Sequence, residues 1–179
     1  AQRQRRAAMW SLDCEAFYRA VGRQRSELWR NGIVLPDGVQ LDERCCFGDA
    51  SAAVKCSRLS NLVVHRVRQA IAAVDAAYPT RDATWLAWQE ERRSAARACG
   101  LSCEEVERWA CLSWVGMYID DSAGGGADDE VFDADGVPLL RDGAQVRRQT
   151  LHFEAARAVL AELGWRSAPS KEQPPGSQL

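Results

Sequence analysis

The feature that most constrains the fold is an almost uninterrupted apolar run from Leu112 to Ile119, which ends directly in Asp120-Asp121. A run of this length and composition favours a strand in the middle of a sheet, where both of its faces are covered. A second, shorter run predicts a buried strand from Met9 to Asp13, and it also ends on a carboxylate. The sequence therefore predicts two central strands that both end on acidic side chains.

Adjacent strands would bring these carboxylates together. Carboxylates held about 4 Å from one another in a dry site need a divalent cation to neutralise them. Magnesium is the cation that prefers carboxylate oxygens together with substrate phosphates. The alternative is that each Asp simply ends its strand at a turn, and neither motif alone decides between the two interpretations.

Helical periodicity fills most of the chain between the two strands. From Ala52 to Asp75 the apolar residues recur at intervals of three and four, which predicts one long amphipathic helix. A second helix is predicted from Asp82 to Cys99, with Gly100 as its C-terminal stop. The capping box Ser102-Cys-Glu-Glu105 predicts a third, short helix.

The remaining elements are shorter. Pro36-Asp37-Gly38 indicates the turn of a hairpin, and Gly124-Gly125-Gly126 is interpreted as a flexible hairpin arm. A helix is predicted from Asp142 to Leu163, a final short strand from Trp165 to Lys171, and a frayed tail from Glu172 onward. This order of elements is typical of an α+β domain with two main helices on one face of an antiparallel sheet.

Composition limits the class of protein. The 179 residues are 46% apolar and 27% charged, with a formal net charge of −2, which is typical of one ordinary soluble domain. The 13 Gly, 6 Pro and 7 Cys exclude a collagen, a low-complexity chain and a disulfide-stabilised mini-protein. No stretch approaches the roughly 18 to 20 apolar residues that span a bilayer, so no membrane partner is expected. An odd number of cysteines without a Cys-x-x-Cys pair favours a reducing, intracellular compartment, the cytoplasm or the nucleus.

The net charge conceals two segments of opposite sign. Residues 1–30 hold seven Arg against three acidic residues, a balance of +4, and these arginines could face a nucleic-acid backbone. Residues 120–142 hold eight acidic residues against Arg141, a balance of −7. A segment that acidic is either a solvated loop or a cation site.

Two other patterns are interpreted structurally. Asp133-Ala-Asp135-Gly136 does not fit the register of a calcium loop and predicts a solvated turn. The two histidines, His65 and His152, lie within predicted helices without a Ser or Cys at a meaningful spacing. A catalytic triad is therefore not expected.

Four blocks of the chain resemble reverse transcriptases. Tyr118-Ile119-Asp120-Asp121 matches the Tyr-x-Asp-Asp box of that family, at the turn of a hairpin after an apolar strand. The segment from Ser11 to Val21 is similar to the block with the first metal-binding Asp and an aromatic residue five positions later. Phe47-Gly48-Asp-Ala-Ser-Ala52 resembles the segment that opens the long helix, and Gly164 to Lys171 resembles the block after the second helix. The blocks follow one another in the family's order from about Met9 to Pro174.

The resemblance implies a polymerase palm, a ferredoxin-like antiparallel sheet with two main helices on one face. It implies two-metal transfer of a nucleotide from a dNTP to a primer 3′-hydroxyl, with two Mg²⁺ ions, or Mn²⁺ in their place. Asp13 and Asp120 would hold the metal ions, Asp121 would support them, and Lys171 would lie near the leaving pyrophosphate. Three further residues are implied on the nucleotide and template side: Tyr18, the gate against ribose, with Phe47 and Gly48.

The resemblance also implies a domain organisation and partners. Residues 1–174 would form the palm of a retroelement RNA-directed DNA polymerase, with fingers and thumb missing or incomplete, followed by a frayed tail at 175–179. Residues 76–114 would be a helical insertion before the catalytic hairpin, and the family's Pro and Phe are replaced by Ala53 and Cys56. The expected partners are an RNA/DNA template-primer and a dNTP, and the oligomeric state is not predicted. Two alternatives stay open: an RNA-dependent RNA polymerase palm, or a non-catalytic relic that only binds nucleic acid or partner chains.

Overall fold

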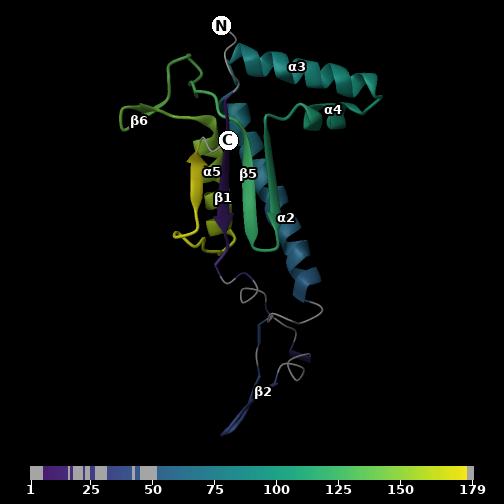
Figure 1. Cartoon of the computed structure of the whole chain (residues 1–179), viewed down its shortest axis with the longest axis vertical. Coiled ribbons are helices and arrows are strands. Elements are labelled where there is room, and N and C mark those ends of the chain that lie inside the picture. The colour runs from purple at the N-terminus through teal and green to yellow at the C-terminus, as the bar shows by residue number, and fades with distance from the viewer. Residues whose placement is uncertain are drawn as a thin grey trace.

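A computed structural model describes residues 6–15, 17, 22, 25–26, 32–41, 43–44 and 52–176. Three of the expected site residues, Tyr18, Phe47 and Gly48, lie outside the described residues. Within them the chain combines helices with antiparallel strands (Figure 1). The expected α+β class is confirmed at this level.

The main sheet has four strands in the order β4-β5-β1-β8, and its paired strands are antiparallel. Their bounds are β1 (Ala7–Asp13), β4 (Ser113–Tyr118), β5 (Asp121–Ala127) and β8 (Gln173–Gly176). In Figure 1 the first strand of the chain lies beside β5, more than a hundred residues later in the sequence. The centre of the sheet is therefore formed by two strands that are more than a hundred residues apart in the sequence.

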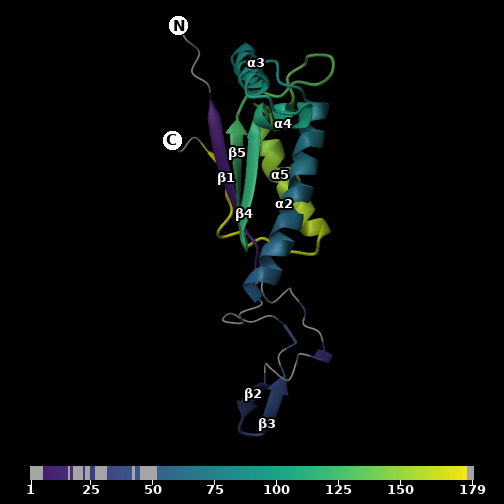
Figure 2. The same ribbon diagram turned by 90° about the vertical axis from the view of Figure 1, so that its right-hand side faces the viewer.

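Helices α2 (Ala52–Ala77) and α5 (Arg148–Glu162) cover one face of this sheet, as Figure 2 shows from the side. Alternate residues of β1, Trp10 and Leu12, point to that face and are almost completely buried. They meet apolar side chains of both helices, among them Val63, Val67, Phe153 and Leu160. The sheet and the two helices thus share one core.

Two further helices, α3 (Ala83–Ala98) and α4 (Cys103–Trp109), lie between α2 and β4 in the chain. Both begin where local chemistry predicts, because Asp82 accepts the backbone N–H of Thr84 and Ser102 forms a capping box with Glu105. Gly100 takes the positive φ of +75° that favours glycine after a helix. The predicted helical stretch before the apolar strand is confirmed.

The hairpin predicted around Pro36-Asp37-Gly38 is also confirmed, as β2 (Gly32–Leu35) and β3 (Gly38–Leu41). A second hairpin, β6 (Leu140–Arg141) and β7 (Ala144–Gln145), was not predicted. It occupies the start of the helix expected from Asp142 to Leu163. The turn at Asp142 and Gly143, with φ values of +51° and +77°, stops helical geometry there, so α5 begins only at Arg148.

The C-terminal predictions need correction too. Residues 165–171, expected as the final strand, contribute only an isolated bridge between Ser167 and Cys14. The last strand is β8, which pairs with β1 and includes Pro175 and Gly176 from the expected tail. A strand that carries two prolines is confined to a sheet edge, because proline lacks the N–H for a second neighbour. Among the described helices, none is long and apolar enough to cross a membrane.

Gly124-Gly125-Gly126, expected as a flexible arm, is the middle of the central strand β5. Gly124 lies opposite Trp10 of β1, and the Trp10 indole occupies the space that a Cβ at position 124 would need. At Gly126 the φ of +150° and the Leu112 carbonyl likewise exclude a side chain. These glycines are required by close packing and not by flexibility.

Gly124→Ala is therefore expected to lower the free energy of unfolding by about 1 to 3 kcal/mol, because the added methyl group overpacks the site against Trp10. Urea unfolding followed by circular dichroism measures the change. The matched control is Gly116→Ala in β4, where the new Cβ meets only an ordinary contact of 4.0 Å with the Trp114 ring. Equal losses in both variants would contradict this account of Gly124.

Candidate functional site

Three of the predicted carboxylates meet at one end of the sheet. Asp13, the last residue of β1, lies directly opposite Asp121, the first residue of β5. Side chains at such positions point to the same face, with Cβ atoms about 4.5 to 5.5 Å apart. Asp120 lies in the turn between β4 and β5, and its carbonyl oxygen accepts the Cys14 N–H at 3.0 Å.

Lys171 reaches the same place from the C-terminal part of the chain. Its Nζ contacts Oδ2 of Asp13. The hydrogen bond with Asp13, followed by the negative charge of the same residue, raises the pKa of Lys171 above its usual value. The Lys171 segment is held by the backbone, because the Ala168 N–H donates to the Asp13 carbonyl at 2.9 Å. Asp13, Asp121 and Lys171 line one open cavity together with Ser170.

The negative charge at this end of the sheet affects the neighbouring residue Cys14. Burial raises the pKa of the Cys14 thiol to about 12, and the negative charges of Asp13, Asp120 and Asp121 contribute to the rise. All three carboxylates therefore lie close enough to Cys14 to disfavour its negatively charged thiolate form. In the part of the chain that the structure describes, Lys171 is the only cationic side chain that forms an ion pair with any of them. The region carries an excess of negative charge.

The oxygen atoms at this end of the sheet are of the kind that bind a divalent cation. Among the described residues, no group of three or more His, Cys, Asp or Glu side chains is arranged to hold a metal ion. Magnesium, however, is commonly held by one or two carboxylates, with substrate phosphates and water completing its shell. The facing pair of Asp13 and Asp121, with Asp120 beside it, fits that chemistry.

Removing Lys171 tests whether these carboxylates attract a divalent cation. Lys171→Met is expected to strengthen Mn²⁺ binding by several-fold, because the competing ammonium group next to Asp13 is lost. Calorimetric titration of Mn²⁺ into the chain measures this. Lys55→Met, which removes the only other lysine, is the control and should leave the affinity unchanged. Weaker binding by Lys171→Met would contradict the prediction.

The acidic segment 120–142 is expected from the sequence to be a solvated loop or a cation site. In the structure some of its acidic residues are buried and others are exposed. Asp128 and Asp129 are only 3% and 6% exposed. Asp128 pairs with Arg6 and Arg147, and Asp129 pairs with the buried Arg148. Their charge is thus neutralised inside the protein, by arginines that lie outside residues 120–142.

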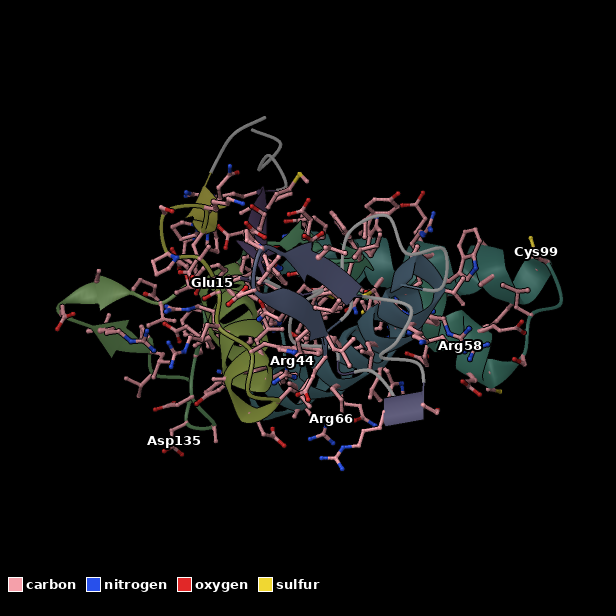
Figure 3. All side chains as sticks on the ribbon, turned by 90° about the horizontal axis from the view of Figure 1, so that it is seen from below. Glu15, Arg44, Arg58, Arg66, Cys99 and Asp135 are labelled. Carbon is pink, nitrogen blue, oxygen red and sulfur yellow. The ribbon has the colours of Figure 1, made fainter. Side chains whose placement is uncertain are left out.

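Asp133 lies in the turn that the sequence predicted, where its carboxylate accepts the Val137 N–H at 2.8 Å. Figure 3 shows Asp135 at the margin of the molecule. In this view Asp135 and Cys99 lie on opposite sides, with Arg58 and Arg66 between them. The acidic turn is therefore separate from the arginines of α2.

The arginines on the polar face of α2 are partly used within the protein. Arg66 forms an ion pair with Glu162 of α5 at 3.0 Å, and Arg68 donates to the Val115 carbonyl at 3.1 Å. Arg58 is exposed near the N-terminal end of the helix. Of these arginines, Arg58 alone forms no hydrogen bond or ion pair with another described residue.

A cluster that sequence spacing did not reveal surrounds His152, which is fully buried. Its Nδ1 lies 3.0 Å from the Ser113 hydroxyl and its Nε2 lies 2.9 Å from Oδ1 of Asp75. Burial by itself would raise the pKa of Asp75, but the His152 hydrogen bond and the charges of His152 and Arg148 lower it overall. Sequence spacing therefore did not reveal that Ser113 lies next to His152.

The three residues come from α2, β4 and α5, so no local motif could have shown this arrangement. Gln149 also donates to the Ser113 hydroxyl, at 3.3 Å, and Arg148 binds Asp75. Both ring nitrogens of His152 are occupied and its ring is closed off from solvent. The cluster therefore acts as a buried polar network that links the two main helices to the sheet.

No protein-family model matches the chain, and a search of curated proteins finds no relative.

Proposed function

We propose that the chain is the palm of a retroelement RNA-directed DNA polymerase. The observation that carries the proposal is the facing pair of Asp13 and Asp121 at the end of two neighbouring strands, beside the Tyr118–Asp121 turn. Lys171, expected near the leaving pyrophosphate, contacts Asp13 in the same cavity. Residues from three distant parts of the sequence thus lie close together, which supports the proposal.

The topology supports the same proposal. The core elements follow the order β1, α2, β4, β5, α5, β8, and the sheet order is β4-β5-β1-β8. This is the order of a split βαβ unit of ferredoxin-like type, and a palm of that type is what the resemblance to reverse transcriptases implies. In this proposal, α3 and α4 are the helical insertion that precedes the catalytic hairpin.

The chain's own residues have distinct parts in the proposed reaction. Asp13 and Asp120 provide carboxylate oxygens for two metal ions, and Asp121, opposite Asp13, supports them. Bound magnesium ions would activate the primer 3′-hydroxyl and neutralise charge on the triphosphate. Lys171 exchanges its contact with Asp13 for the pyrophosphate as negative charge accumulates there.

The contact between Lys171 and Asp13 also favours one alternative, a non-catalytic relic. In such a protein the ammonium group would replace the metal ion permanently as the partner of Asp13. The Mn²⁺ titration described above separates the two candidates. Binding by the unaltered chain supports the polymerase, whereas no binding at millimolar Mn²⁺ supports the relic.

Primer extension tests the activity directly. A protein that carries this chain with complete fingers and thumb is expected to extend a DNA primer on an RNA template in the presence of Mg²⁺ and dNTPs. Replacing dNTPs by NTPs should abolish extension, because the resemblance places Tyr18 as a gate against ribose. Efficient use of NTPs would instead indicate an RNA-dependent RNA polymerase.

A further inference from the structure

The turn that carries Asp120 holds a residue in an unfavourable backbone conformation. Ile119 has a φ of +58°, a region that β-branched residues rarely adopt. Among the described non-glycine residues only Asp142 shares a positive φ. A two-residue hairpin turn with a positive φ at its first central position alone has the pattern of a type II′ turn, where glycine is usual. Surrounding contacts must therefore hold Ile119 in place.

Helix α2 provides such a contact through Ser60, which is 2% exposed. The Ser60 hydroxyl lies 2.6 Å from the Ile119 carbonyl oxygen and 2.8 Å from the Cys56 carbonyl oxygen. The Cys56 carbonyl is also the normal helical acceptor of the Ser60 backbone N–H. The Ile119 carbonyl oxygen is therefore the acceptor that loses a hydrogen bond when the Ser60 hydroxyl is removed.

The next residue of the turn is held from the other side. The Cys14 N–H, directly after β1, donates to the Asp120 carbonyl at 3.0 Å. Consecutive peptide groups of the turn are thus fixed by α2 and by the chain after Asp13. The Ile119 side chain packs against the main core as well. The turn is clamped between the helix layer and the acidic end of the sheet.

We infer that Ser60 is a positioning residue, whose hydroxyl fixes the Ile119 peptide group and thereby the direction of the Asp120 and Asp121 carboxylates relative to Asp13. Ser60 touches neither substrate nor metal ion in this role. Only the consequence of this inference for catalysis rests on the proposed function. The clamping of the turn can be measured independently.

The experiment compares Ser60→Ala with Ser57→Ala, an exposed serine on the same helix. Hydrogen–deuterium exchange over residues 117–122 and Mn²⁺ affinity are measured at a temperature where all variants are folded. Ser60→Ala is expected to speed exchange and to weaken Mn²⁺ binding by about tenfold each, the size of one buried hydrogen bond. Ser57→Ala should change neither. If Ser60→Ala does not fold, Ser60→Cys is used in its place, because cysteine has a similar volume and only a weak hydrogen-bond donor.

A second-site variant separates positioning from general stability. Ile119→Gly, added to Ser60→Ala, should restore slow exchange and Mn²⁺ binding, because glycine adopts this φ without the hydroxyl. The inference is overturned if Ser60→Ala behaves as Ser57→Ala, or if the double variant is as impaired as Ser60→Ala alone. If the unaltered chain binds no Mn²⁺, the proposed function fails, and the exchange rates alone decide the role of Ser60.

Discussion

Asp120→Asn is expected to reduce primer extension on an RNA template by at least about a thousandfold. The substitution keeps the shape of the side chain but removes its charge from the group formed with Asp13 and Asp121. Charge stabilisation by a bound metal ion contributes several kcal/mol to such a reaction, and each 1.36 kcal/mol is a factor of about ten in rate. Single-turnover extension with Mg²⁺ measures the loss.

Asp135→Asn is the matched control. It removes the same charge from an exposed turn at the margin of the molecule (Figure 3). Its extension rate should equal that of the unaltered protein. Undiminished extension by Asp120→Asn would refute the two-metal proposal, and an equal loss in both variants would show that only the overall charge matters.

Arg148→Met is expected to lower the free energy of unfolding by about 3 to 5 kcal/mol. The Arg148 guanidinium is 1% exposed and binds Asp129, Asp75 and the Tyr78 carbonyl. Removing it leaves the buried carboxylate of Asp129 without another cationic partner among the described residues. Breaking a buried ion pair from one side costs this much because the remaining charge stays desolvated.

The control is Arg141→Met, which breaks the ion pair between Arg141 and Glu154 on the surface. Because both side chains remain in contact with water, its effect should be far smaller. Urea unfolding at constant pH compares the two variants. Similar midpoints would mean that the Arg148 network is not a main source of stability.

The sequence predicted those features that depend on local patterns. The capping box at Ser102 and the hairpin at Pro36-Asp37-Gly38 became the expected elements. The apolar run before Asp120 became the expected strand, but its predicted central position was wrong, because β4 pairs only with β5 and lies at an edge of the described sheet. Periodicity and capping are properties of residues that are neighbours in the sequence, so these elements could be predicted from local patterns. The carboxylates at the strand ends could be proposed as a site for the same reason.

Features that depend on distant partners could not be predicted. The burial of Asp129 requires Arg148 of α5, and the Ser113 contact with His152 joins β4 to α5. The three glycines of β5 resemble a loop until the neighbouring strands are placed, with Trp10 of β1 against Gly124 and the Leu112 carbonyl against Gly126. The direct register of Asp13 with Asp121 is likewise set by strand pairing across most of the chain.

That register has a consequence for how the protein folds. The β4–β5 hairpin needs only a two-residue turn and can form early, whereas β1 must find β5 across a loop of more than a hundred residues. The facing pair of Asp13 and Asp121 therefore forms only when β1 docks on β5. A chain in which β1 is not docked would carry the Tyr118–Asp121 turn without the facing Asp13, so the proposed cation site and the native topology are acquired together.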